Sequence, residues 1–87
     1  ILGMILMHQG KTKEAIDEFV KAEPLLAESP LDHARNLYWL GFACAKLGRL
    51  DAARRYLKEA VAIQSPYQAA AQELLDKVEK ERAKRLY

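Results

Sequence analysis

The side chains of this sequence that could do chemistry are two histidines and one cysteine, and they stand apart from one another. Neither His8 nor His33 lies four residues from another histidine or cysteine, the spacing that places two metal ligands on one face of a helix. Cys44 is the single cysteine, which excludes an internal disulfide. We therefore predict no metal site and no cofactor, and we expect both histidines at the surface.

Nucleophilic and phosphate-transfer chemistry also lack their usual patterns. Ser29, Asp32 and His33 are the residue types of a hydrolase triad, but they are neighbours in sequence beside Pro30 and fit the start of a helix. The four glycines are dispersed, so no glycine-rich loop is present to bind a phosphate. Cys44 stands among apolar residues at helical spacing, which indicates a buried and unreactive thiol. The sequence predicts that the chain is not an enzyme.

Charge and hydropathy give no support to a nucleic-acid or membrane partner. The formal net charge is +2, and Glu79 and Glu81 interrupt the basic run at residues 77–85, which carries no aromatic side chain for base stacking. That run is typical of a solvated helix end. The apolar residues 1–7 lack a basic leading segment and a cleavage site, and are too few to cross a bilayer. We expect no nucleic acid, no membrane insertion and, with a single cysteine, a cytoplasmic protein.

Apolar periodicity and helix-boundary residues predict five helices and no strand. The first two cover residues 1–9 and about 12–23, with a turn at Gly10. Ser29 and Ser65 each precede a proline, the order of an N-cap and a first helical residue, so new helices are expected near residues 30 and 66. Gly48 separates the two helices between those starts. Pro24 is expected to end or kink the second helix, because its ring clashes one turn back.

Small residues predict that the two central helices form a close antiparallel hairpin hinged at Gly48. Their facing stripes at helical spacing are Leu37, Leu40, Gly41 and Cys44 on the first helix, and Ala53, Leu57 and Ala60 on the second. A glycine inside a helix costs about 1 kcal/mol relative to alanine, so Gly41 indicates a packing requirement. We expect Gly41 to lie close to Ala53.

The sequence matches itself at a shift of 38 residues, which places residue 2 on residue 40. All the matches are packing or turn positions: Leu2 on Leu40, Gly3 on Gly41, Gly10 on Gly48, Ala15 on Ala53, Phe19 on Leu57 and Ala22 on Ala60. The first helix is short at its front, because residues that match Asn36 and earlier positions would precede Ile1. The chain therefore contains two copies of one helical hairpin.

On these residues the chain resembles the tetratricopeptide repeat family. Residues 34–66 resemble one repeat, and residues 2–22 a second copy without its first turn. The resemblance implies an all-α fold of antiparallel helical hairpins stacked as a short right-handed superhelix. We expect one domain, residues 1–87, with repeat 1 at about 1–28, repeat 2 at about 30–65 and a capping helix at about 66–87. The spacing exceeds the family's repeat of about 34 residues, which suggests an inserted turn around residues 24–29. That family spacing also puts Leu75 at the small-residue position of the third unit.

A second apolar stripe on the helix from Pro30 exceeds the needs of internal packing. Arg35, Trp39, Phe42 and Lys46 follow at helical steps on the side away from Gly41. In the resembled family this side lines a concave groove that holds peptides or helices of other proteins. The resemblance thus implies a partner-binding set, which comprises Met4, His8, Arg35, Tyr38, Trp39, Phe42, Lys46, Glu73 and Asp76.

Two hypotheses of function remain open from the sequence. In the first, the chain is a non-catalytic module that binds a peptide or a helix of a partner protein in its groove. In the second, it is a structural segment of a longer helical solenoid, or a self-associating unit that forms a homo-oligomer, and the second stripe is internal.

Overall fold

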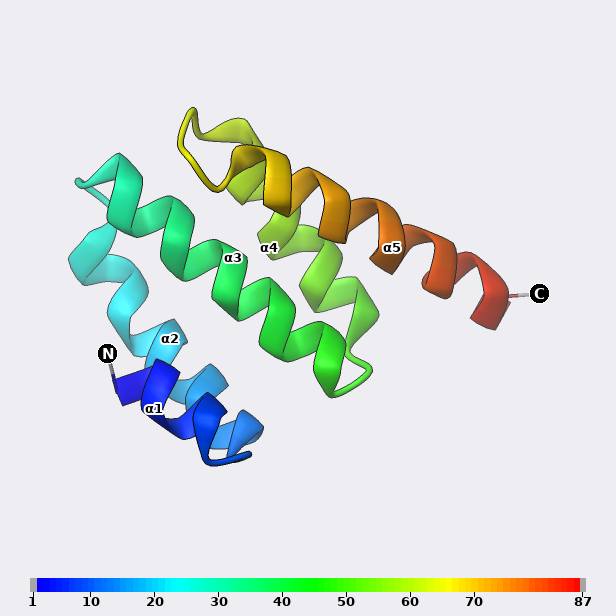
Figure 1. The fold of residues 1–87 in the computed structure, drawn as a ribbon, viewed down its shortest axis with the longest axis horizontal. Helices are drawn as coiled ribbons and strands as arrows, with labels where there is room; N and C mark the ends of the chain where they lie inside the picture. The colour runs from blue at the N-terminus through cyan, green and yellow to red at the C-terminus, as the bar shows by residue number, and fades with distance from the viewer. Residues whose placement is uncertain (1, 87) are drawn as a thin grey trace.

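The computed structural model describes residues 2–86, which form five helices and no strand. The helices are α1 (Leu2–His8), α2 (Thr12–Leu26), α3 (Pro30–Lys46), α4 (Leu50–Ala62) and α5 (Gln68–Leu86) (Figure 1). The prediction of an all-α fold with five helices is confirmed. The predicted helical positions 1 and 87 lie outside the described residues.

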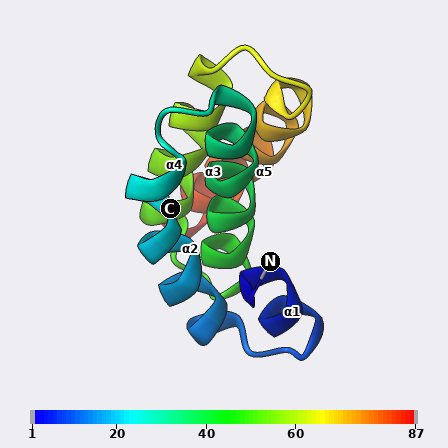
Figure 2. The same cartoon turned by 90° about the vertical axis from the view of Figure 1, so that its left-hand side faces the viewer.

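Helices that follow one another in sequence also pack against one another. α3 is central, because it packs against α2 on one side and α4 on the other, while α1 packs on α2 and α5 on α4. Figure 2 shows two layers, with α2 and α4 in one and α1, α3 and α5 in the other. The arrangement is a row of hairpins in which α3 and α4 form the complete one.

The turns inside the two hairpins have the same backbone structure. Gly10 and Gly48 adopt φ angles of 77° and 79°, in the left-handed region that favours glycine. The N–H of Gly10 donates to the carbonyl of Met7, and the N–H of Lys11 donates to the carbonyl of Leu6. The matching residues around Gly48 form the same two bonds. Both turns are therefore Schellman motifs, which satisfy the last carbonyls of the helix before the chain reverses.

The two glycines inside helices stand where the helices of each hairpin touch. A Cβ atom built on Gly41 would lie 2.6 Å from Cγ of Leu57 and 3.4 Å from the carbonyl oxygen of Ala53. A Cβ atom on Gly3 would lie 2.6 Å from Cε1 of Phe19, the residue that matches Leu57. The predicted close approach of Gly41 to Ala53 is confirmed, and the first hairpin repeats it.

The boundaries of α2 and of the proline-led helices differ in detail from the sequence expectation. α2 does not end at Pro24 but continues to Leu26, and has 15 residues against 13 in α4. Pro24 lies in the last turn, where its missing N–H costs one bond and little helix follows. The hydroxyl of Ser29 donates to Asp32 rather than capping a backbone N–H. α5 begins at Gln68, two residues after the expected start.

α5 is buried on one face only. Its buried residues are Ala71, Leu75 and Val78. The residues of α3 that stand 35 positions earlier are Asn36, Leu40 and Ala43, which are also buried. Asn36 bonds a carbonyl of α2, so this face of α3 turns toward the preceding helix. α5 therefore packs on α4 in the way that α3 packs on α2.

This match corrects the register predicted for the third unit. Leu75 corresponds to Leu40 and not to Gly41, because the spacing between α3 and α5 is one residue longer than the family's usual repeat. At this spacing Asp76 corresponds to Gly41, and Glu79 corresponds to Cys44, the next residue of the same stripe. Both carboxylates are exposed. A further helix on this side would have to bury these carboxylates. The face of α5 that carries these two carboxylates is therefore polar, whereas the face that packs on α4 is apolar.

The basic end of α5 is attached to the second hairpin and is not simply solvated, as the sequence suggested. Three side-chain contacts join the two: Arg54 Nε to Glu79 Oε1 at 3.2 Å, Arg82 Nε to Asp51 Oδ1 at 2.5 Å, and Arg85 NH1 to the carbonyl oxygen of Gly48 at 3.3 Å. The last contact places a cation at the carboxyl end of α3, where the helix dipole favours it. These exposed contacts orient α5 more than they stabilise it.

We expect Gly41→Ala to lower the free energy of unfolding, measured by urea denaturation with circular dichroism. The added methyl group overlaps Leu57, an overpacking cost of about 1–3 kcal/mol, while alanine returns about 1 kcal/mol of helix propensity. In a Leu57→Ala background, held folded by a stabilising osmolyte, the same change should stabilise. If Gly41→Ala changed the free energy of unfolding equally in the two backgrounds, with the osmolyte present in both, the contact with Leu57 would not explain the glycine at position 41.

Candidate partner-binding cleft

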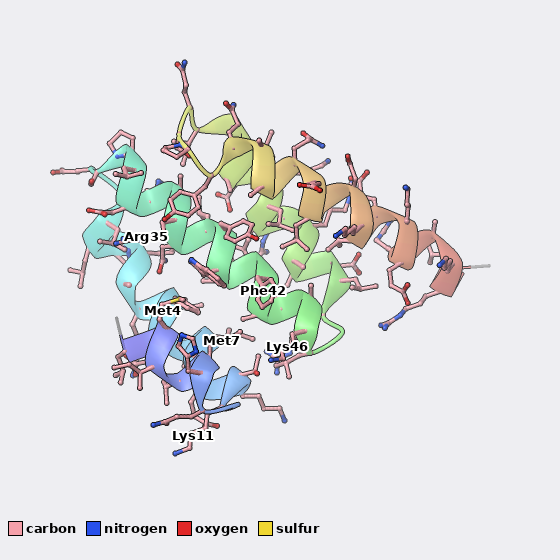
Figure 3. All side chains as sticks on the ribbon, viewed as in Figure 1. Met4, Met7, Lys11, Arg35, Phe42 and Lys46 are labelled. Atoms are coloured by element: carbon pink, nitrogen blue, oxygen red, sulfur yellow. The ribbon has the colours of Figure 1, made fainter. Side chains whose placement is uncertain are left out.

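An open cleft of about 490 Å³ lies between the short helix α1, the second half of α2 and the first half of α3. Its apolar lining consists of Met4, Ile5, Phe19, Ala22, Leu26 and Trp39. Its polar lining consists of His8, Asp32, Arg35, Asn36 and Tyr67. Figure 3 shows Met4 on α1 and Arg35 on α3 at two edges of this space. Apolar walls with a few polar groups at the edge are typical of a binding site.

The cleft lies beside the first described residues of α1. α1 has 7 residues, whereas α3, which occupies the equivalent place in the second hairpin, has 17. Leu2, the first described residue of α1, matches Leu40, so residues 30–39 of α3 have no counterpart among residues 2–86. Among residues 2–86, the second half of α2 is not covered in the way that the first half of α3 covers α4.

Trp39 lies at the centre of an aromatic row on α3. Its ring meets Tyr38 edge-on at a centroid distance of 5.3 Å and Phe42 edge-on at 5.5 Å. Tyr38 in turn lies 6.0 Å from the ring of Tyr67. Edge-to-face pairs at these distances are attractive, which holds the indole in a fixed orientation. Trp39 is half-buried, and it lines the cleft with the surface that remains.

A polar network fixes α3 against α2 beneath the cleft. Asn36 is 7% exposed, and its Nδ2 donates to the carbonyl oxygen of Phe19 at 2.9 Å and to Oε2 of Glu23 at 2.5 Å. Nε2 of His33 lies 2.9 Å from the other carboxylate oxygen. The expectation of two surface histidines is therefore wrong for His33, which is half-buried, while His8 is exposed. Because partnered buried polar groups specify one geometry, the network sets the position of the cleft wall.

The charge of Arg35 at the edge of the cleft is already balanced. Its NH2 donates to Oδ1 of Asp32 at 3.2 Å, with the two side chains 53% and 40% exposed. Such an exposed pair contributes little to stability. It leaves the mouth of the cleft without a strong net charge, since the lining contains no further Asp, Glu, Lys or Arg side chain.

The structure brings part of the predicted partner-binding set together. Met4, His8, Arg35 and Trp39 line the cleft, and Tyr38 and Phe42 flank Trp39 along α3. Lys46 is exposed at the last residue of α3, beyond Phe42 (Figure 3). Glu73 and Asp76 are exposed on α5 and do not line the cleft, because the spacing that selected them is one residue short of the actual register.

Sequence reasoning missed several residues of the lining. Leu26 belongs to the part of α2 beyond Pro24, where the sequence predicted no helix. Tyr67 comes from the turn before α5 and reaches the cleft only through tertiary packing. Ile5 had a readable signal, because it is a large apolar residue of the first helix outside the stripe of Gly3.

A smaller cleft of about 210 Å³ lies between the turn at Gly48 and the end of α5. The ion pair of Arg82 with Asp51 and the bond from Arg85 to Gly48 join its walls. Among residues 2–86 no group of three or more histidine, cysteine or carboxylate side chains could hold a metal ion. Within the same residues no helix is long and apolar enough to cross a membrane.

The thiol of Cys44 is shielded within the core. The residue is 2% exposed, and burial raises the pKa of the thiol, while Arg49 and Arg55 lower it to a smaller extent. A free cysteine with a pKa of about 8.5 becomes a thiolate as the pH rises through that value. The folded chain therefore keeps Cys44 protonated at a pH where the unfolded chain loses the proton, so its stability should decrease as the pH rises through that range.

We expect a thiol-specific reagent at about pH 8.5 to label Cys44 at least about tenfold more slowly in the native chain than in denaturant, because the thiolate is the reactive form. The matched control is Cys44→Ala combined with Ala27→Cys, which moves the thiol to an exposed position. That variant should react at the same rate in both conditions. Rapid labelling of native Cys44 would contradict the shielding.

The comparison with known proteins agrees with this geometry. A family model described as tetratricopeptide repeat matches residues 1–65, a segment that contains both hairpins, α1 to α4. No curated protein and no solved structure matches the chain. Repeats of this family generally serve as protein–protein interaction modules. The chain belongs to the tetratricopeptide repeat family, and its fold is the predicted short superhelix of stacked antiparallel helical hairpins.

Proposed function

We propose that the chain is a non-catalytic interaction module that binds a helix or an extended peptide of a partner protein in the cleft between α1, α2 and α3. The observation that supports this most is the environment of Trp39. The indole is held by aromatic neighbours, is half-buried, and borders an apolar space that the described side chains leave open. Tryptophan in such a position is the residue type that contributes most to protein–protein affinity.

The walls of the cleft are already ordered in the absence of a partner. Asn36 and Glu23 bond α3 to α2, so binding would not have to order the wall that carries Trp39. Preorganisation of this kind lowers the entropic cost of association. The partner then gains affinity by burying apolar side chains against Met4 and Trp39.

The other predicted residues extend this surface along α3. Phe42 and Lys46 continue the stripe of Trp39 toward the end of the helix (Figure 3). A partner helix that followed this stripe would present apolar anchors at i, i+3 or i+4, and i+7. Tyr38 supports Trp39 from the side.

We expect displayed helical peptides, selected on the immobilised chain, to lose binding when Trp39→Ala and Phe42→Ala are combined. Loss of aromatic contacts at an interface commonly costs about 2 kcal/mol or more, or roughly 30-fold in affinity. Binding is measured by titration calorimetry, and circular dichroism confirms unchanged helical content. Met4→Lys should weaken binding independently, because it places a charge in the apolar wall, whereas Lys58→Ala on the exposed side of α4 should not. Undiminished binding by the double variant would exclude this surface.

Self-association is a second candidate, because the free side of α1 is apolar. Leu2 and Ile5 are 52% and 47% exposed, whereas the matching residues Leu40 and Ala43 are both 0% exposed. We expect sedimentation to show a dimer at high protein concentration, and Leu2→Asp with Ile5→Asp to abolish it, since buried unpaired carboxylates oppose association. A monomer mass at every concentration would exclude this candidate.

A further inference from the structure

The acidic residues of the chain are unevenly distributed over its helices. Of the 12 acidic residues, Asp32 is the one that lies on α1 or α3, and its carboxylate is paired with Arg35. The segments 2–13 and 33–50 contain no aspartate and no glutamate. By contrast α2 and α4, which form the other layer in Figure 2, both carry acidic residues. The side of the molecule formed by α1 and α3 is therefore poor in negative charge.

An apolar residue followed one turn later by a basic residue stands at the same place on α1 and α3. On α3 this pair is Phe42 and Lys46, which corresponds to Met4 and His8 of α1 at the shift of 38 residues. Residues four positions apart lie on the same face of a helix. Phe42 is half-buried with its ring edge-on against Trp39, and Lys46 is exposed at the end of α3 (Figure 3). Apolar and basic side chains thus lie next to one another toward the carboxyl end of α3.

α5 adds a second lysine to this side of the molecule. At the spacing of 35 residues that relates α5 to α3, Lys77 corresponds to Phe42, and Glu81 corresponds to Lys46. The carboxylate of Glu81 is paired with Arg85 at 3.6 Å. In the part of the chain that the structure describes, neither Lys46 nor Lys77 forms an ion pair. The positive charge of these two lysines is therefore not balanced by a paired carboxylate.

A lysine near the carboxyl end of a helix also has a local role, because it interacts favourably with the helix dipole. That role accounts for Lys46 but not for Lys77, which lies in the middle of α5. It also does not account for the absence of acidic residues from segment 33–50, since protein surfaces commonly intersperse both signs of charge. A surface with charge of one sign attracts a partner of the opposite charge.

We infer that the partner segment is acidic as well as apolar: its apolar side chains cover Phe42, and carboxylates beside them face Lys46 and Lys77. This deepens the proposed function and rests on it. Complementary charges beside an apolar contact contribute mainly to specificity and to the rate of association. The apolar contacts would therefore hold the segment, and the lysines would select it. Arg35, toward the other end of α3, is already paired, so the preference belongs to the carboxyl end.

The first test determines the charge of selected peptides. A displayed library of helical peptides, with a fixed leucine stripe and random neighbouring positions, is selected on the immobilised chain at low salt. We expect the ratio of acidic to basic residues to rise at least about threefold over the input, since one exposed ion pair changes affinity by up to about fivefold. Selection on a variant that combines Lys46→Glu with Lys77→Glu should enrich basic residues instead.

The matched control combines Lys13→Glu with Lys58→Glu, at exposed positions of α2 and α4. It changes the net charge by the same amount and should retain the preference for acidic peptides. Circular dichroism confirms that both double variants keep their helical content. If the acidic preference survived Lys46→Glu with Lys77→Glu, or disappeared in the control, the carboxylates would bind elsewhere and the inference would be overturned.

The second test measures how affinity depends on salt. A selected acidic peptide and a copy with glutamine in place of its carboxylates are titrated with the chain by fluorescence anisotropy. The acidic peptide should bind more tightly at low salt, and the difference should disappear at about 1 M salt, where the screening length is about 3 Å. Equal affinities at low salt would overturn the inference. Polyglutamate, which has no apolar side chains, should compete poorly, and competition as strong as that of the selected peptide would also overturn it.

The inference and the proposed function fail separately. If selected peptides depend on Trp39 and Phe42 but show no acidic excess, the inference is wrong and the interaction module stands. If the library yields no peptide that depends on Trp39, the proposed function fails, and the inference fails with it. A dimer that Lys46→Glu dissociates would assign this surface to a second copy of the chain and would overturn the inference as stated.

Discussion

The close approach of a glycine to a large apolar side chain sets the geometry of this structure. Gly41 lies over Leu57, and Gly3 lies over Phe19, each within a distance that would not admit a methyl group. Because the residues at the contact decide how near two helix axes come, a glycine at this position lets the two helices of each hairpin approach closely. The repeated Schellman turns then reverse the chain at the same point of each hairpin.

The surface of α3 has three sides, and each side has different neighbours. The face of Gly41 packs on α4, and the face of Asn36 and Leu40 packs on α2. The remaining side carries Trp39 and Phe42, which the side chains of residues 2–86 leave half-buried. A helix that is apolar on more sides than its neighbours occupy has a surface left for another molecule. The proposed binding surface is thus a consequence of the central position of α3.

The sequence could predict the hairpins but not the cleft. The internal match at 38 residues and the helical glycines are local signals, and they sufficed for five helices and for the contact of Gly41. The predicted end of α2 was wrong, because a proline in the last turn of a helix removes only one backbone hydrogen bond. The register of α5 depends on a loop whose length departs from the family average, so Glu73 and Asp76 were placed one residue off. Tyr67 joins the cleft through packing alone, for which no local pattern exists.

The two ends of the stack differ in chemistry, and this difference links binding to stability. Asp76 and Glu79 make the outer face of α5 costly to cover, whereas the side of α1 exposes Leu2 and Ile5 beside the cleft. An added helix would therefore gain more apolar contact beside α1 than over the carboxylates of α5. A helix bound there would contact Ala22 and Phe19, and Phe19 belongs to the core of the first hairpin. Since a ligand that binds only the folded state stabilises it, occupation of the cleft should stabilise the hairpin with the shortest helix.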